Sequence, residues 1–245
     1  MLIGLGACKL PPAMRYASHL GKMAVVVKLL RHGSNELHIL QYLHSFKSPS
    51  NHTVPLLDSF KFESGCLLMF PEGNRLDIGL DLGDFGNSVT DLMHQFVEGV
   101  AFLHQHGVAH LDIKPQNVVV SRGRQLWLID FDISVCIQSD SSTIDWWCGT
   151  PGWMAPEIGE RNGSRQQYNP IHADLWSCGL VLCYLTTRNR AGGHDKFARL
   201  AMQLLNKDPS CRPALTPWLE TSNKSRGMKR KFVLKEMEVP LQVLC

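Results

Sequence analysis

The sequence lacks the marks of several protein classes. No apolar run approaches the roughly 18–20 residues that a membrane helix needs, so no membrane span is expected. The eight cysteines form no CxxC pair and no metal-ligand spacing with the eleven histidines, which argues against zinc and disulfide-framework proteins. Residues 1–7 carry no charged n-region of a secretory signal. We therefore expect an intracellular protein with reduced, structural cysteines.

Charge is distributed unevenly along the 245 residues. The chain has 25 Lys and Arg against 22 Asp and Glu, and residues 221–245 hold six of the basic residues against Glu236 and Glu238. The rest is close to neutral and is not expected to bind nucleic acid, which requires neutralisation of phosphates. The basic tail is interpreted as a solvated extension, with a nuclear-import signal or a contact with an anionic surface as the alternatives. The expected location is therefore the cytoplasm, together with the nucleus if the tail is an import signal.

The first part of the chain is rich in strand signals. Lys28 is embedded in a β-branched, apolar run, which predicts a strand. After it, Ser34 or Asn35 can cap a helix. The break at 71–75 is the expected hinge. The expected elements are a strand at 23–30, a helix through Leu37, Leu40, Leu43 and His44, and two strands within 52–70.

Beyond the hinge the apolar spacing becomes helical. Apolar residues from Val89 to Leu103 predict one face of a long helix, and Gly107 suits its C-terminal cap. Further expected elements are short strands at 117–120 and 126–129, a long loop over 131–156, and helices at about 173–187, 196–206 and 214–220. A small strand-rich part followed by a larger helical part results.

Three motifs in a fixed order carry the chemistry. They are His110-Leu111-Asp112-Ile113-Lys114-Pro115-Gln116-Asn117, then Asp130-Phe131-Asp132, then Ala155-Pro156-Glu157. Phosphoryl transfer needs a carboxylate for the acceptor hydroxyl, a cation near the transferred phosphate, and oxygen ligands for Mg²⁺. Asp112 can be the carboxylate and Lys114 the cation. A lone Asp in a loop would more simply cap a turn, but the joint match outweighs that interpretation.

These motifs resemble those of the eukaryotic protein kinase superfamily, of the Ser/Thr type. The resemblance covers roughly residues 14–220. It implies an α+β, bilobal fold with a small β-rich N-lobe and a larger α-helical C-lobe. The implied bounds are about 1–70 for the N-lobe, 71–75 for the hinge and 76–220 for the C-lobe, with the tail at 221–245. ATP and Mg²⁺ are the implied cofactors, and a protein with a Ser/Thr acceptor is the implied substrate.

The resemblance gives each polar motif residue a role. Asp112 would accept the proton of the substrate hydroxyl, and Lys114 would neutralise charge on the moving phosphoryl group. Asn117 and Asp130 would hold Mg²⁺. A lysine at position 114 is the pattern of Ser/Thr kinases.

Binding of the nucleotide is the implied task of the N-lobe. Lys28 would contact the α- and β-phosphates and form an ion pair with Glu36. The alternatives are an edge-strand lysine and a first-turn glutamate favoured by the helix dipole. Gly4 and Gly6 match the first two glycines of the nucleotide-covering loop, although Lys9 occupies the place of the third.

Five residues match structural positions of the family: His110, Thr150, Glu157, Asp174 and Arg212. Glu157 and Arg212 would form a buried pair that anchors the activation segment, a task that suits bidentate Arg–carboxylate geometry. Asp174 would brace the catalytic loop. Thr150 lies in a loop expected close to the substrate and again suggests Ser/Thr acceptors.

Several departures from the family leave other interpretations open. Leu111 replaces the arginine that receives the activation-loop phosphate, which predicts constitutive geometry or another mode of control. Asp132 replaces a glycine; Asp tolerates left-handed backbone better than most residues, and its carboxylate is expected near the metal site. The stretch 188–195 is short for the usual docking helix. The alternatives are a pseudokinase that serves as a binding or scaffolding module, and a phosphotransferase for small molecules.

Overall fold

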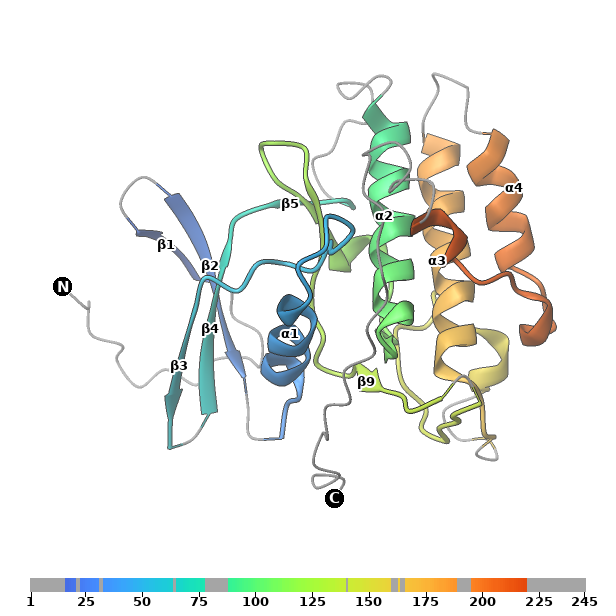
Figure 1. Cartoon of the computed structure of the whole chain (residues 1–245), viewed down its shortest axis with the longest axis horizontal. Coiled ribbons are helices and arrows are strands. Elements are labelled where there is room, and N and C mark those ends of the chain that lie inside the picture. Colours follow the sequence, from blue (N-terminus) through green and yellow to red (C-terminus); the bar gives the residue numbers. More distant parts are fainter. Residues whose placement is uncertain are drawn as a thin grey trace.

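A four-stranded antiparallel sheet forms the first lobe (Figure 1). Its strands are β1 (Tyr16–Leu20), β2 (Met23–Leu30), β3 (Asp58–Phe62) and β4 (Gly65–Pro71), in the order β1-β2-β4-β3. The expected strand at 23–30 is β2, inside the sheet, where Lys28 pairs with Leu68 of β4. The computed structural model describes residues 16–20, 23–30, 33–63, 65–77, 88–139, 141–159, 163, 166–188 and 195–219.

The helix α1 (Glu36–Ser45) lies between this sheet and the second lobe (Figure 1). Its buried apolar residues are Leu37, Ile39, Leu40 and Leu43. Of the two expected capping residues, Ser34 makes the contact, since its Oγ accepts a hydrogen bond from Glu36 N at 3.3 Å. The side chain of Asn35 makes no capping hydrogen bond.

Helices dominate the second lobe. In the described part of the chain they are α2 (Ser88–Gln105), α3 (Pro170–Arg188) and α4 (Asp195–Leu204). The short strands are β5 (Asn74–Arg75), β6 (Val108–Ala109), β7 (Val118–Val120), β8 (Leu126–Leu128) and β9 (Val135–Cys136). Gly107 follows α2 with a φ of +66°, a left-handed conformation that glycine adopts without strain. The expected α+β, bilobal fold is confirmed, while of the helix expected at 214–220 only 217–219 are helical among the described residues.

The connection between the lobes is short. β4 ends at Pro71, and β5 already pairs with β7 of the second lobe, so only Glu72 and Gly73 separate the two ladders. A second connection is made by the segment that follows α1 in the chain. Val54 N donates to Leu128 O at 2.9 Å, and Leu128 N donates to His52 O at 2.7 Å. Main-chain hydrogen bonds therefore join the two lobes both at the hinge and at residues 52–54.

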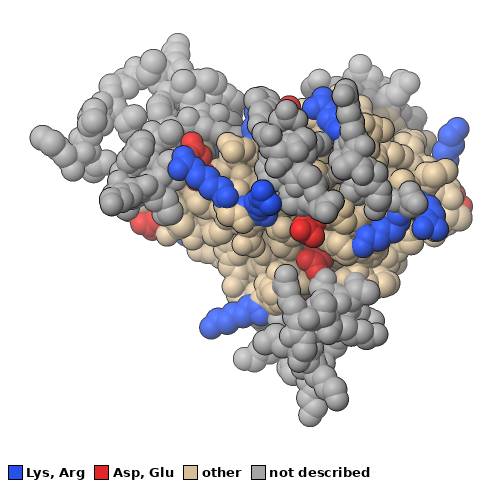
Figure 2. All heavy atoms as spheres, turned by 90° about the horizontal axis from the view of Figure 1, so that it is seen from above, with Lys and Arg blue, Asp and Glu red and all other residues tan. Residues whose placement is uncertain are grey.

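Some sequence predictions fall outside the described residues: Gly4, Gly6, the tail 221–245 and most of the stretch between α3 and α4. Six cysteines are described and all are free thiols; Cys178 is buried, whereas Cys136 and Cys211 are exposed. No described helix combines the length and the apolar character needed to cross a membrane. Figure 2 shows one face of the molecule, on which basic and acidic side chains are scattered among uncharged residues.

Candidate active site

A buried aspartate of α3 holds the loop that follows β6. The Asp174 carboxylate accepts hydrogen bonds from His110 N at 2.6 Å and from Leu111 N at 2.8 Å. It also lies 3.1 Å from His104 Nε2 of α2. These contacts keep Leu111 at a φ of +66°, a conformation that costs a residue with a β-carbon roughly 1–2 kcal/mol. Asp174 therefore fixes the position of the loop that carries Asp112.

Asp112 lies in a closed set of hydrogen bonds. Lys114 Nζ donates to Asp112 Oδ2 and to Thr150 Oγ1, each at 2.6 Å. Thr150 Oγ1 donates to Asp112 Oδ1 at 2.6 Å. Asn117 Nδ2 donates to the main-chain O and to Oδ2 of Asp112, each at 2.9 Å. One carboxylate is thus contacted by a cation, a hydroxyl and an amide.

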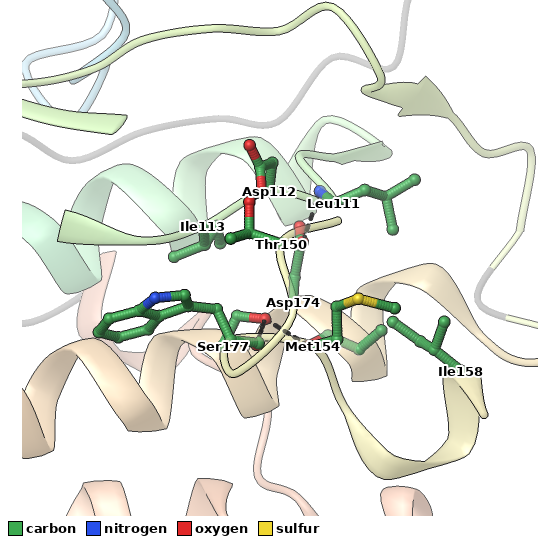
Figure 3. A pocket seen from close by; sticks show the side chains of 10 residues that line it. Leu111, Asp112, Ile113, Thr150, Met154, Ile158, Asp174 and Ser177 are labelled. Carbon is green, nitrogen blue, oxygen red and sulfur yellow. Dashed lines mark hydrogen bonds between the residues drawn. The ribbon is translucent and has the colours of Figure 1, made fainter. Parts of the chain in front are cut away.

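Figure 3 shows Asp112 and Thr150 on one side of a small pocket, with Asp174 and Ser177 of α3 on the other. The remaining lining is mostly apolar: Leu111, Ile113, Trp153, Met154, Ile158 and Ala173. The dashed lines in Figure 3 include the hydrogen bond from Leu111 to Asp174. An apolar surface therefore borders the polar groups around Asp112.

Lys28 of β2 is surrounded by three carboxylates. Its Nζ lies 2.5 Å from Glu36 Oε2 and 2.6 Å from Asp130 Oδ1. Asp132 Oδ2 follows at 3.0 Å. The side chain of Lys28 is 13% exposed and that of Glu36 only 1%. The structure thus brings together the lysine and the glutamate that the sequence pairs across eight residues, and it adds both aspartates.

The carboxylates and the burial of the site set its protonation. Burial alone would lower the pKa of Lys28, but the carboxylates, Glu36 first, hold it well above its ordinary value. Burial raises the pKa of Glu36 to about 7, against the opposing effect of Lys28. Burial also acts to raise the pKa of Asp130, but Lys28 outweighs it and holds that pKa below its ordinary value. Lys28 therefore stays a cation and Asp130 an anion.

The segment after β8 is fixed by its backbone and by a buried ring. Asp130 has a φ of +71°. Phe131 is fully buried with its ring 4.7 Å from that of His110, and its N donates to Glu36 Oε1 at 3.2 Å. The left-handed residue is therefore Asp130, whereas Asp132, at the glycine position of the family pattern, is not among the residues with positive φ. Asp130 thus takes the left-handed conformation directly before the buried Phe131 ring.

Arg212 and Glu157 form a bidentate ion pair. Nη1 lies 2.5 Å from Glu157 Oε1, and Nη2 lies 2.8 Å from Oε2. Arg212 also donates to His172 O at 2.7 Å and to Asn206 O at 3.0 Å, and its guanidinium lies over the ring of Trp176. The arginine side chain is 0% exposed. The pair ties the segment after Thr150 to the end of the second lobe.

The same segment is held by apolar packing around Leu111. This residue is 6% exposed and belongs to a cluster with Ala109, Ala155, Ile158, Tyr168 and Ala173. Such packing does not depend on a phosphate. Leu111 therefore contacts the segment through apolar packing and not through a charge.

Residues 27–207 match the family model of the protein kinase domain. The chain belongs to the protein kinase family. It is 32% identical over 195 residues to CBL-interacting protein kinase 26 of Oryza sativa subsp. japonica, covering 67% of this chain and 39% of that protein. It is 30% identical over 213 residues to the phosphorylase b kinase gamma catalytic chain, liver/testis isoform, of Mus musculus, covering 84% of this chain and 50% of that protein. The chain thus spans half or less of the length of these curated relatives.

Two contacts of this protein kinase lie outside the motifs that the sequence indicates. His104 contacts Asp174, and Ser34 Oγ donates to Asp132 Oδ1 at 2.9 Å. The first has no clear signal in the sequence. The second has an indirect one, since an aspartate in place of glycine adds a carboxylate that can accept hydrogen bonds.

Proposed function

We propose that this protein kinase transfers the γ-phosphoryl group of ATP, with Mg²⁺, to Ser or Thr hydroxyls of a protein substrate. The hydrogen bonds that join Asp112, Lys114 and Thr150 carry the proposal. The Asp112 carboxylate accepts a hydrogen bond from the Thr150 hydroxyl at 2.6 Å. The Lys114 ammonium contacts both groups. A hydroxyl nucleophile and a negatively charged phosphoryl group need these partners, whereas a module that only binds does not.

Each polar residue has a proposed part in the transfer. The hydroxyl oxygen of the acceptor bonds to the γ-phosphorus, and the bond from phosphorus to the bridging oxygen of ADP breaks. Asp112 takes the hydroxyl proton, and Lys114 neutralises charge on the transferring group. Lys28, held by Glu36, contacts the α- and β-phosphates.

The available oxygens fit a magnesium ion. Asn117 uses its Nδ2 toward Asp112, which leaves its amide oxygen for a cation. Asp130 uses Oδ1 toward Lys28, which leaves Oδ2. Carboxylate and amide oxygens are the donors that Mg²⁺ prefers, and we propose these two residues as its ligands. A bound cation would neutralise charge on the nucleotide phosphates.

Transfer of labelled phosphate from ATP to a mixed basic-protein substrate tests the proposed function. Label is expected on serine and threonine after acid hydrolysis of the products, and it should disappear when EDTA removes Mg²⁺. Nucleotide binding without transfer would favour the pseudokinase instead. Label on a small molecule but not on protein would favour the small-molecule phosphotransferase.

Phosphorylation of the activation segment is expected to have little effect on activity. The variants Ser142→Asp and Thr143→Asp should change the initial rate by less than about twofold, because Leu111 supplies no positive charge to receive the new carboxylate. Initial rates of both variants, beside wild type treated with phosphatase, measure this. A many-fold increase in the rate would contradict this prediction and would show that another basic residue binds the introduced carboxylate.

The location and the partners of the kinase are also proposals. The six described cysteines are free, which agrees with a reducing compartment, and we propose an intracellular location. Because the family phosphorylates proteins, we propose a protein substrate and no nucleic-acid partner.

A further inference from the structure

We propose that Asp132 is an internal competitor for the phosphate groups of the nucleotide at Lys28, and so sets the affinity of the site. This inference rests on the proposed function, in which Lys28 binds those phosphates. It assigns a task to a residue that the family pattern gives as glycine.

The contacts of Lys28 are the first support. An ammonium group has three N–H donors, and three carboxylates lie within 3.0 Å of Lys28 Nζ. Glu36 is 1% exposed and stays with the lysine. The side chain of Asp132 is 44% exposed and is therefore the carboxylate that leaves most readily. A phosphate that approaches Lys28 meets this position already occupied by a negative charge.

The second support is the contact that holds Asp132 in place. Its Oδ2 faces Lys28, while its Oδ1 accepts a hydrogen bond from Ser34 Oγ at 2.9 Å. Ser34 itself is fixed at the start of α1, where Glu36 N donates to it. The carboxylate is thus held from both sides, by a strand of the first lobe and by the cap of α1.

Three carboxylates around one ammonium also carry an excess of negative charge. Like charges repel, so a nucleotide phosphate and Asp132 oppose each other at the same donor. Adenosine has no phosphate and does not meet this opposition. Comparing the affinity for a nucleotide with the affinity for adenosine therefore distinguishes competition at Lys28 from a general change of the site.

Titration calorimetry of the whole chain tests the inference with ADP, with the β–γ-imido analogue of ATP, and with adenosine, each with and without Mg²⁺. Asp132→Asn keeps the shape and the acceptor for Ser34 but removes the charge. It should bind both phosphate-bearing ligands roughly 2- to 5-fold more tightly, as expected for the loss of one partly exposed ion pair, and adenosine unchanged. Ser34→Ala should have a smaller effect in the same direction, and none in the Asp132→Asn background. Asp145→Asn, at an exposed aspartate that is not among the carboxylates around Lys28, is the matched control.

The outcomes separate the inference from the proposed function. Unchanged or weaker binding of ADP by Asp132→Asn, with wild type binding normally, overturns the inference alone. If the weakening depends on Mg²⁺, Asp132 is a metal ligand. If neither protein binds any of the three ligands, the inference falls together with the proposed function. A gain for adenosine equal to that for ADP also overturns it.

Discussion

Asp112→Asn is expected to lower the rate of phosphate transfer roughly 10²- to 10⁴-fold, the range for loss of a positioned general base. The asparagine oxygen can still accept the hydrogen bond from the Thr150 hydroxyl, so the shape of the loop is retained. It cannot take a proton from the acceptor, and it no longer balances the charge of Lys114, which lies 2.6 Å from Asp112 Oδ2. Initial rates with labelled ATP and a protein substrate measure the effect.

Two controls separate chemistry from folding in this variant. Affinity for ADP should be unchanged, because among the described residues Asp112 bonds to Lys114, Thr150 and Asn117 and not to Lys28 or its carboxylates. The melting temperature should stay close to wild type. Asp58→Asn, at an exposed aspartate of β3, makes the same chemical change outside the site and should keep full activity. Transfer by Asp112→Asn at the wild-type rate would contradict the role proposed for Asp112.

Arg212→Ala is expected to destabilise the fold by about 3–5 kcal/mol, the cost of breaking a buried ion pair by removing one partner. The guanidinium is 0% exposed and binds Glu157, His172 O and Asn206 O. Alanine leaves the Glu157 carboxylate and both carbonyl groups without this donor. For a chain of this length the melting temperature should fall by roughly 6–20 °C.

An exposed ion pair of the same protein is the control for this prediction. Arg122 Nη2 lies 3.8 Å from Glu72 Oε2, and the side chain of Arg122 is 91% exposed. Arg122→Ala should therefore cost less than about 1 kcal/mol. Urea denaturation of the two variants beside wild type compares them. Similar midpoints for both would show that the buried pair does not stabilise the lobe.

Prediction from sequence works best where contacts are local. Asp112, Lys114 and Asn117 lie within six residues, so one loop conformation brings them together. Lys28 and Glu36 are joined by a strand, a turn and the start of a helix, and the periodicity of these elements determines which way both side chains face.

Contacts that depend on packing between distant segments could not be predicted in this way. Ser34 and Asp132 are 98 residues apart, and their hydrogen bond depends on how α1 lies against the segment after β8. The left-handed conformation of Asp130 was likewise not expected, because the sequence directs attention to Asp132, which occupies the glycine position of the family pattern. The strained Leu111 lies in the loop after β6 and depends on Asp174 of the distant helix α3.

The two ends of α1 are anchored by different kinds of contact. At its C-terminal end, Tyr42 Oη donates to His106 O at 3.1 Å and Asn51 Nδ2 donates to Leu43 O at 3.0 Å, and the segment behind them pairs with β8. At its other end Glu36 is held by Lys28 and by Phe131 N, and Ser34 donates to Asp132. Loss of these polar side-chain contacts would therefore release the start of α1 and leave its end bound through main-chain carbonyl groups.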